Sequence, residues 1–226
     1  MSEPWFKSRR VQALGVGLVS AVVLALSAVS PERIPPLEAV SCVAFAWSVW
    51  LLAYNLVLGW FVGLVGVAGY AVVFYQARLY GETYLQVFYF VTSVQAIWVW
   101  WRGNDQRPER PVQAMPASWR IPLVVVAVVG TEALRHLLSH QGDAAPFWDA
   151  LTNALSLIAQ ILLMLRYTES WYLWITVDVI YVPLYASRGL LVTSGLYAIL
   201  LIMAVGGLLS FLRLQREHEL AEAAPA

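Results

Sequence analysis

The chain has 226 residues, of which 60% are hydrophobic and 12% are charged, and its mean hydropathy is +0.67. Soluble domains carry about 25% charged residues, so this composition excludes a soluble protein and indicates an integral membrane protein. The formal net charge is zero, which gives the chain no general attraction to nucleic acid. Cys42 is the only cysteine, which excludes a disulfide framework and a cysteine metal site.

Eight apolar segments follow one another, each close to the length of about 20 residues that a helix needs to cross a bilayer. The first resembles a signal peptide, but it has near-spanning length and no clear cleavage site before Pro31, so we expect a retained helix. The chain closes with a polar tail whose last part, ELAEAAPA (residues 219–226), is expected to be disordered. The predicted transmembrane helices cover residues 11–29, 37–54, 59–76, 84–101, 121–139, 147–165, 170–187 and 193–212.

The basic residues are distributed unevenly between alternate loops. If the N-terminus is cytoplasmic, ten basic residues lie on the inner side and three on the outer side, with Arg135 near the outer end of the fifth helix. Because cytoplasmic loops carry an excess of Lys and Arg, both termini are predicted to face the cytoplasm. The inner residues are Lys7, Arg9, Arg10, Arg102, Arg107, Arg110, Arg120, Arg166, Arg213 and Arg216, and the outer ones are Arg33, Arg78 and Arg188.

A polar, proline-rich connection at residues 102–120 separates two similar halves. Displacing the chain by 111 residues aligns Pro35 with Pro146, Trp60 with Trp171, and Tyr70 with Tyr181. An even number of helices separates equivalent segments, so the halves have the same orientation, as in transporters built from parallel repeats. We therefore predict an all-α membrane protein with a 3+1+3 arrangement plus an extra first helix. Its parts are an N-terminal helix (1–34), a three-helix bundle (35–101), a cytoplasmic loop and linker helix (102–145), a second three-helix bundle (146–212) and a cytoplasmic tail (213–226).

The segment WYLWITVD (residues 171–178) places Trp171, Trp174 and Asp178 on one face of a helix, at i, i+3 and i+7. A carboxylate without a polar neighbour in such a segment is costly in lipid and marks a functional site by default. Two aromatic faces beside an anion can receive a flat organic cation. Alternatively, the tryptophans belong to the interfacial belt and Asp178 bonds a neighbouring helix. Only Trp171 has an aromatic counterpart in the first half, as expected for one asymmetric ligand.

Further polar side chains lie within the predicted helices. Gln86 shares a helix face with Ser93, and Asn153 shares one with Ser156 and Gln160. Each of them can contact a ligand or bond a neighbouring helix, where one hydrogen bond contributes about 0.6 kcal/mol.

A second polar group lies in the fifth predicted helix. Glu132 and Arg135 are expected to form a local ion pair. His136 and His140 are spaced like metal ligands, but no third ligand completes a site. The sequence has no nucleophile–base pair, phosphate loop or zincin motif, so we expect a protein without enzymatic activity or a cofactor. A membrane-embedded enzyme that uses Glu132, His136 and His140 is the alternative from another class.

Three segments resemble the PnuC family of bacterial vitamin transporters: LYGETYLQVFYF (79–90), PFWDALTNALS (146–156) and YTESWYLWITVDVIYVPLYASRGL (167–190). The resemblance implies a fold like that of SWEET sugar transporters, in the inner membrane of a bacterium. It also implies uptake of nicotinamide riboside, an NAD precursor, by facilitated diffusion, with a separate cytosolic kinase retaining the product. The chain leaves the oligomeric state open, a homo-oligomer included.

The resemblance also assigns candidate substrate-binding residues. Trp171, Trp174 and Asp178 fall on the family's substrate motif W-x-x-W-x-x-x-Asn/Asp, and Gln86 falls on its LQ element. Gln160 or Asn153 would then bond hydroxyl or amino groups. Members that take nicotinamide riboside tend to carry Asn where this chain has Asp178, so a thiamine transporter of the same superfamily is one alternative. A symporter in which Asp178 carries a proton is another.

Overall fold

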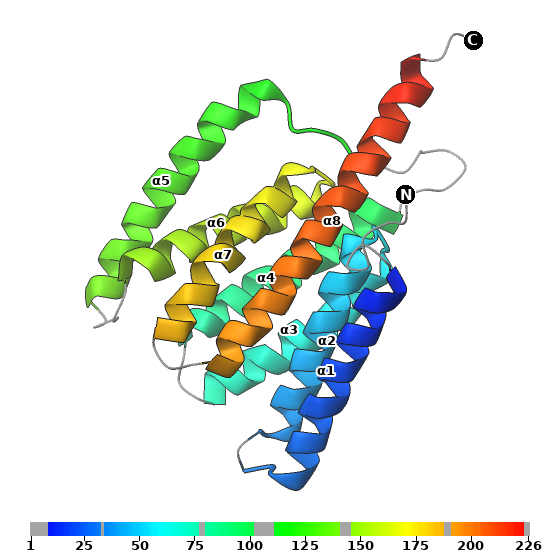
Figure 1. Cartoon of the computed structure of the whole chain (residues 1–226). Coiled ribbons are helices and arrows are strands. Elements are labelled where there is room, and N and C mark those ends of the chain that lie inside the picture. Colours follow the sequence, from blue (N-terminus) through cyan, green and yellow to red (C-terminus); the bar gives the residue numbers. More distant parts are fainter. Residues whose placement is uncertain are drawn as a thin grey trace. The chain divides into compact units, whose positions relative to one another are not determined.

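The computed structural model describes residues 9–32, 34–76, 80–101, 111–140, 146–187 and 191–223. Several predicted features lie outside them, among them Lys7, most of the loop that precedes the fifth helix, and the three basic residues assigned to the outer side. Within the described residues the structure contains eight α-helices, which confirms the all-helical prediction (Figure 1). These are α1 (Arg9–Val29), α2 (Pro36–Ala53), α3 (Leu58–Gln76), α4 (Tyr80–Trp101), α5 (Ala117–His140), α6 (Pro146–Met164), α7 (Glu169–Ser187) and α8 (Leu191–Ala223).

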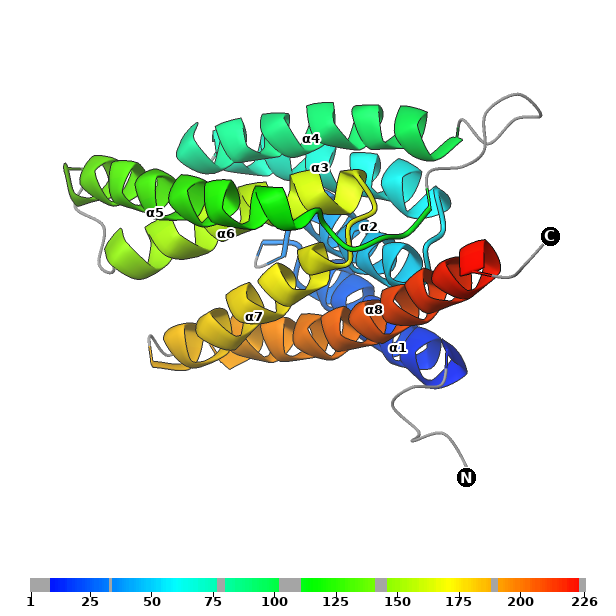
Figure 2. The same cartoon turned by 90° about the horizontal axis from the view of Figure 1, so that it is seen from above.

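The chain divides into two compact units, Met1–Glu109 and Arg110–Ala226. In the first unit, α2 packs against α1 and α3, and α3 packs against α4. In the second unit, α6 packs against α5 and α7, and α7 runs beside α8 (Figures 1 and 2). Each unit is therefore a chain of sequential helix neighbours, as short connections favour.

Six of the described helices are long and apolar enough to cross a membrane: α1, α2, α3, α5, α6 and α8. The other two, α4 with 22 residues and α7 with 19 residues, reach spanning length but are less apolar. Those two helices carry Gln86 and Asp178, respectively. All eight helices thus have the length predicted for a spanning helix, and six of them also have the required hydropathy. The two exceptions are the helices that carry the most prominent candidate site residues.

The turns α2–α3 and α6–α7 have the same backbone geometry. Asn55 and Arg166, which are 111 positions apart, both adopt a φ of 57°. In each turn the next amide donates to a carbonyl five residues earlier, from Leu56 to Leu51 at 3.0 Å and from Tyr167 to Leu162 at 2.9 Å. This left-handed helix ending is rare at residues other than glycine, so its recurrence at the same displacement supports the internal repeat.

The same displacement relates two buried aromatic pairs. Trp60 meets Trp100 edge-on with 5.5 Å between ring centroids, and Trp171 meets Phe211 edge-on at 5.5 Å. Trp60 and Trp171 are 2% and 1% exposed. The helix that follows each turn is therefore anchored in its own unit by an equivalent tryptophan.

The helix pairs on either side of these turns, α2–α3 and α6–α7, differ in how closely their backbones can approach each other. A Cβ atom added to Gly66 of α3 would lie 3.0 Å from the backbone nitrogen of Phe45 in α2, and one added to Gly63 would lie 2.6 Å from the Ser48 Oγ. Small residues of this kind let two membrane helices touch through their backbones. The repeat places Val177 and Trp174 at the corresponding positions of α7. Bulky side chains there prevent an equally close approach of α6 and α7.

The C-terminal end corrects one expectation. Residues 219–223, predicted to be disordered, continue α8 as a helix that ends at Ala223. Glu, Leu and Ala are strong helix formers, and the Gln215 amide donates a hydrogen bond of 2.9 Å to Glu219 one turn later. Local propensity therefore extends the helix beyond its apolar part.

The packing of Trp171 predicts an effect of one added methyl group. A Cβ atom at Gly207 of α8 would lie 2.7 Å from the Trp171 ring, which is buried and cannot move aside cheaply. We expect Gly207→Ala to lower stability by about 1–3 kcal/mol, the usual cost of overpacking. Gly195→Ala is the matched control, because the space around Gly195 on the same helix is open. Thermal unfolding in detergent measures both, and equal unfolding temperatures would contradict this packing.

Candidate functional site

The segment Trp171–Asp178 lies wholly within α7, so the predicted face exists. At 100° per residue, Trp171, Trp174 and Asp178 fall within about 60° of one another around the helix axis. Asp178 lies about 10 Å from Trp171 and about 6 Å from Trp174 along that axis. Side chains four residues apart on one helix face are neighbours, so one small ligand can contact both the Trp174 indole and the Asp178 carboxylate.

The two tryptophans of this face have different surroundings. Trp171 is 1% exposed and is enclosed by Phe211 and by the backbone at Gly207. Because Trp60 has the equivalent packing in the first unit, these contacts of Trp171 belong to the repeat. Trp174 is only half-buried, and its counterpart is the small Gly63. Of the two, Trp174 is the indole with surface available to a ligand.

Asp178 is a buried carboxylate that has no partner among the described residues. It is 5% exposed, and no hydrogen bond or ion pair joins it to another residue in the part of the chain that the structure describes. A central Asp costs about 2.5–3.5 kcal/mol in a membrane helix, far more than the roughly 0.6 kcal/mol that one interhelical hydrogen bond returns. Packing within the protein therefore does not account for this side chain.

The predicted polar face of α6 lies on a helix that packs against α7 in the same unit. Ser156 and Gln160 are 5% and 7% exposed, and Asn153 is half-buried. Neighbouring Thr152 bonds the carbonyl of Trp148 in its own helix at 2.9 Å, as Ser41 bonds that of Leu37 in the first unit at 2.7 Å. The Thr152 hydroxyl thus donates its hydrogen bond within its own helix. The second unit brings α6 and α7, with their candidate residues, into one helix pair.

Gln86 lies in α4 of the first unit and is half-buried. The position that corresponds to it in the second unit is Tyr197, which the sequence reasoning did not single out. Tyr197 of α8 contacts Tyr181 of α7 with 4.6 Å between ring centroids, one turn beyond Asp178. Applying the displacement of 111 residues to Gln86 identifies Tyr197 from the sequence, whereas its contact with Tyr181 is a result of the structure.

Other charged groups interact within their own helices. Arg135 donates to Glu132 in α5, which confirms the predicted local ion pair. Glu38 and Asp149 lie in the first turns of α2 and α6, where the helix dipole favours acids. In the described residues, no cluster of three His, Cys, Asp or Glu side chains could hold a metal ion.

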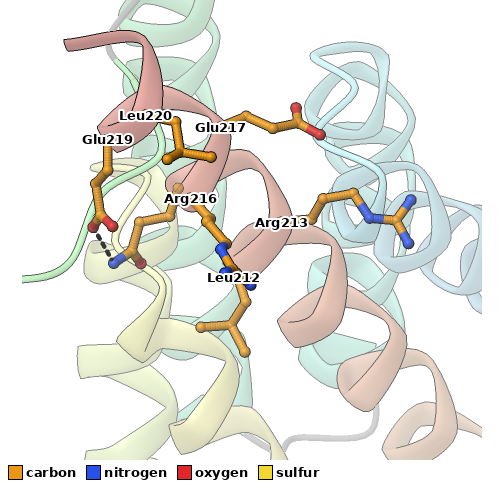
Figure 3. A pocket seen from close by; sticks show the side chains of 7 residues that line it. Leu212, Arg213, Arg216, Glu217, Glu219 and Leu220 are labelled. Carbon is orange, nitrogen blue, oxygen red and sulfur yellow. Dashed lines mark hydrogen bonds between the residues drawn. The ribbon is translucent and has the colours of Figure 1, made fainter. Parts of the chain in front are cut away.

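The structure also has a shallow hollow at the C-terminal part of α8 (Figure 3). All of its lining residues come from this one helix, and none belongs to the predicted site. The lining is Leu212, Arg213, Gln215, Arg216, Glu217, Glu219 and Leu220.

Known proteins resemble this chain over most of its length. A family model described as nicotinamide mononucleotide transporter matches residues 35–213. The nicotinamide riboside transporter PnuC of Escherichia coli (strain K12) is 28% identical over 210 residues, which are 80% of this chain and 87% of that protein. The riboflavin/roseoflavin transporter RibM of Streptomyces davaonensis is 28% identical over 192 residues, or 80% of this chain and 82% of that protein.

The fold is also similar to a solved structure. A crystal structure of the vitamin B3 transporter PnuC matches with a TM-score of 0.67 and 26% sequence identity, and the match covers 90% of this chain and 92% of the other. The family model, the relatives and the fold agree with the resemblance drawn from the sequence motifs. The chain belongs to the nicotinamide mononucleotide transporter family, the PnuC family of membrane transporters.

Proposed function

We propose that this protein takes up nicotinamide riboside across a bacterial membrane through a site built around Asp178. The relatives named for nicotinamide riboside favour this substrate over the thiamine alternative. Nicotinamide riboside carries a positively charged pyridinium ring, so a carboxylate and an aromatic surface suit it chemically. Riboflavin, the flat vitamin in the name of another relative, has no such positive charge.

The observation that carries this proposal is the buried, unpartnered carboxylate of Asp178. Its burial costs free energy, and a bound cation would offset that cost when the site is filled. Because the described residues offer Asp178 no partner, a cationic substrate that supplies one is bound more tightly than a neutral molecule. The same carboxylate would disfavour a neutral vitamin of similar shape, because its burial would then remain uncompensated.

The other candidate residues take roles that follow from their surroundings. Trp174, half-buried and one turn before Asp178, stacks on the pyridinium ring. Trp171 contributes mainly by holding α7 in place through Phe211. Asn153 and Gln160 of α6 bond the hydroxyl or amide groups of the substrate, and Gln86 keeps the role in substrate binding that its place on the LQ element implies.

The proposal extends to the arrangement in the membrane. Two parallel three-helix bundles, α2–α4 and α6–α8, are joined by α5 in a 3+1+3 plan, with α1 outside it. The repeated turn geometry at Asn55 and Arg166 supports this plan. The basic residues favour cytoplasmic termini in the inner membrane. Uptake proceeds by facilitated diffusion, and phosphorylation by a cytosolic kinase retains the substrate.

The charge of the substrate provides a direct test of Asp178. Dihydronicotinamide riboside has nearly the same shape as nicotinamide riboside but a neutral ring. We expect the wild-type protein to bind the cation at least about tenfold more tightly, since contacts with a charged group contribute about 1.5–3 kcal/mol. Asp178→Asn should remove this preference, and Trp174→Ala should weaken binding of both compounds. Titration calorimetry measures the three purified proteins with each riboside, six cases in all, and with riboflavin as a third ligand.

Asp149→Asn is the matched control, because it makes the same chemical change at a half-buried acid of the same unit. This variant should keep the wild-type preference. If Asp178→Asn discriminates between the two ribosides as the wild type does, Asp178 is not the counter-charge of the substrate.

Transport without a driving force separates facilitated diffusion from proton coupling. Proteoliposomes without ATP or ion gradients should fill with nicotinamide riboside until the inner and outer concentrations are equal. An imposed pH gradient should not raise the final level. Accumulation that depends on the pH gradient and stops with a protonophore would instead establish the symporter in which Asp178 carries a proton.

A further inference from the structure

The segment that leads into α5 forms a strap, residues 111–115, which lies against the α6–α7 turn (Figure 2). The Gln113 amide donates to the Arg166 carbonyl at 3.2 Å, and the Thr168 amide donates to the Gln113 carbonyl at 3.1 Å. Together these two bonds form an isolated parallel bridge between Gln113 and Tyr167. The strap thus holds the residues that immediately precede α7.

The strap is also bonded to α7 itself. The Met115 amide donates a hydrogen bond of 2.9 Å to Oε2 of Glu169, the first residue of the helix. On the other side of the turn, the Thr168 hydroxyl donates to the Gln215 side chain of α8 at 2.8 Å. Two consecutive side chains, Thr168 and Glu169, therefore bond the start of α7 to α8 and to the strap.

Apolar contacts hold the strap in place. Val112 and Met115 are each 4% exposed, and Met115 forms a buried cluster with Ile158, Leu162 and Tyr167. Side chains of α5 and α7 pack around this cluster, among them Leu123 and Leu173. Burial of this kind makes the hydrogen bond to Glu169 part of a fixed structure, because Met115 cannot move away without exposing apolar surface.

The first unit lacks the two side chains that make these bonds. Val57 and Leu58 occupy the positions that correspond to Thr168 and Glu169, and neither has a side-chain donor or acceptor. Yet the turn itself has the same geometry in both units. The turn therefore does not require the strap, and the additional bonds occur only at the helix that carries Trp174 and Asp178.

We propose that Glu169 is a positioning residue for substrate binding, which fixes the start of α7 and thereby the depth and tilt of Trp174 and Asp178. This inference rests on the proposed function of α7. When a site is competent in only a fraction of molecules, the apparent dissociation constant rises by the inverse of that fraction. Loss of the Glu169–Met115 bond allows α7 to shift and lowers the competent fraction.

The test compares Glu169→Ala, Glu169→Gln and Glu217→Ala in the purified full-length protein. Glu169→Ala removes the acceptor and should raise the dissociation constant for nicotinamide riboside about tenfold, as expected for a charge-assisted hydrogen bond. Glu169→Gln keeps an acceptor oxygen and should stay within about threefold of wild type. Glu217 is an exposed acid of α8, so Glu217→Ala removes the same charge elsewhere in the unit and should bind normally.

Hydrogen exchange without ligand provides a readout that does not depend on transport. Glu169→Ala should exchange faster than wild type at residues 111–119 and 167–175, and Glu169→Gln should restore protection. A lower unfolding temperature with an unchanged dissociation constant would show a merely structural role and overturn the proposal. So would equal weakening by the Ala and Gln variants. If the wild-type protein does not bind nicotinamide riboside, the proposed function fails, and unchanged exchange in Glu169→Ala would separately refute the strap.

Discussion

The structure must compensate for one unfavourable feature, a carboxylate that is buried in a membrane helix and has no partner among the described residues. Asp178 is almost fully enclosed in α7, and the free energy of its burial must be offset by the rest of the protein or by a ligand. Stabilisation of α7 comes from elsewhere, through the buried indole of Trp171 and the bonds at its first residues. These anchors allow a polar side chain to remain where packing alone would favour an apolar one.

The repeat shows that the two halves differ at the positions of the proposed site. In the first unit, glycines bring α3 into backbone contact with α2, and Val67 occupies the position of Asp178. In the second unit, Trp174 and Val177 replace two of those glycines, so α6 and α7 cannot approach each other as closely as α2 and α3 do. The two units share their turns and their anchoring tryptophans but differ along the helix that follows. A common scaffold is thus closely packed in one copy, whereas the other copy carries the residues that we propose bind the substrate.

Much of this organisation could be predicted from the sequence because it is local. Helix positions follow from runs of apolar residues, and the Glu132–Arg135 pair follows from helical spacing. The displacement of 111 residues located equivalent turns before their geometry was known. The extension of α8 differs from the prediction, because the low hydropathy of residues 219–223 is typical of disordered segments although Glu and Ala favour helix.

The features that escaped prediction depend on contacts between distant residues. The hydrogen bond from Met115 to Glu169 joins residues 54 positions apart, and no local sequence pattern predicts it. The difference between Trp171 and Trp174 also depends on tertiary packing, since both lie on one helix face and only Trp171 meets Phe211. A helical pattern specifies which side chains share a face, whereas burial against a neighbouring helix decides which of them remain available to a ligand.

The most direct measurement is an experimental structure of the protein with nicotinamide riboside bound. The pyridinium ring should lie against the indole of Trp174, with its charged nitrogen within about 6 Å of the Asp178 carboxylate, the range over which opposite charges interact strongly. A ligand bound elsewhere, with the Asp178 carboxylate still buried and unpaired, would contradict the role of this residue as the counter-charge of the substrate.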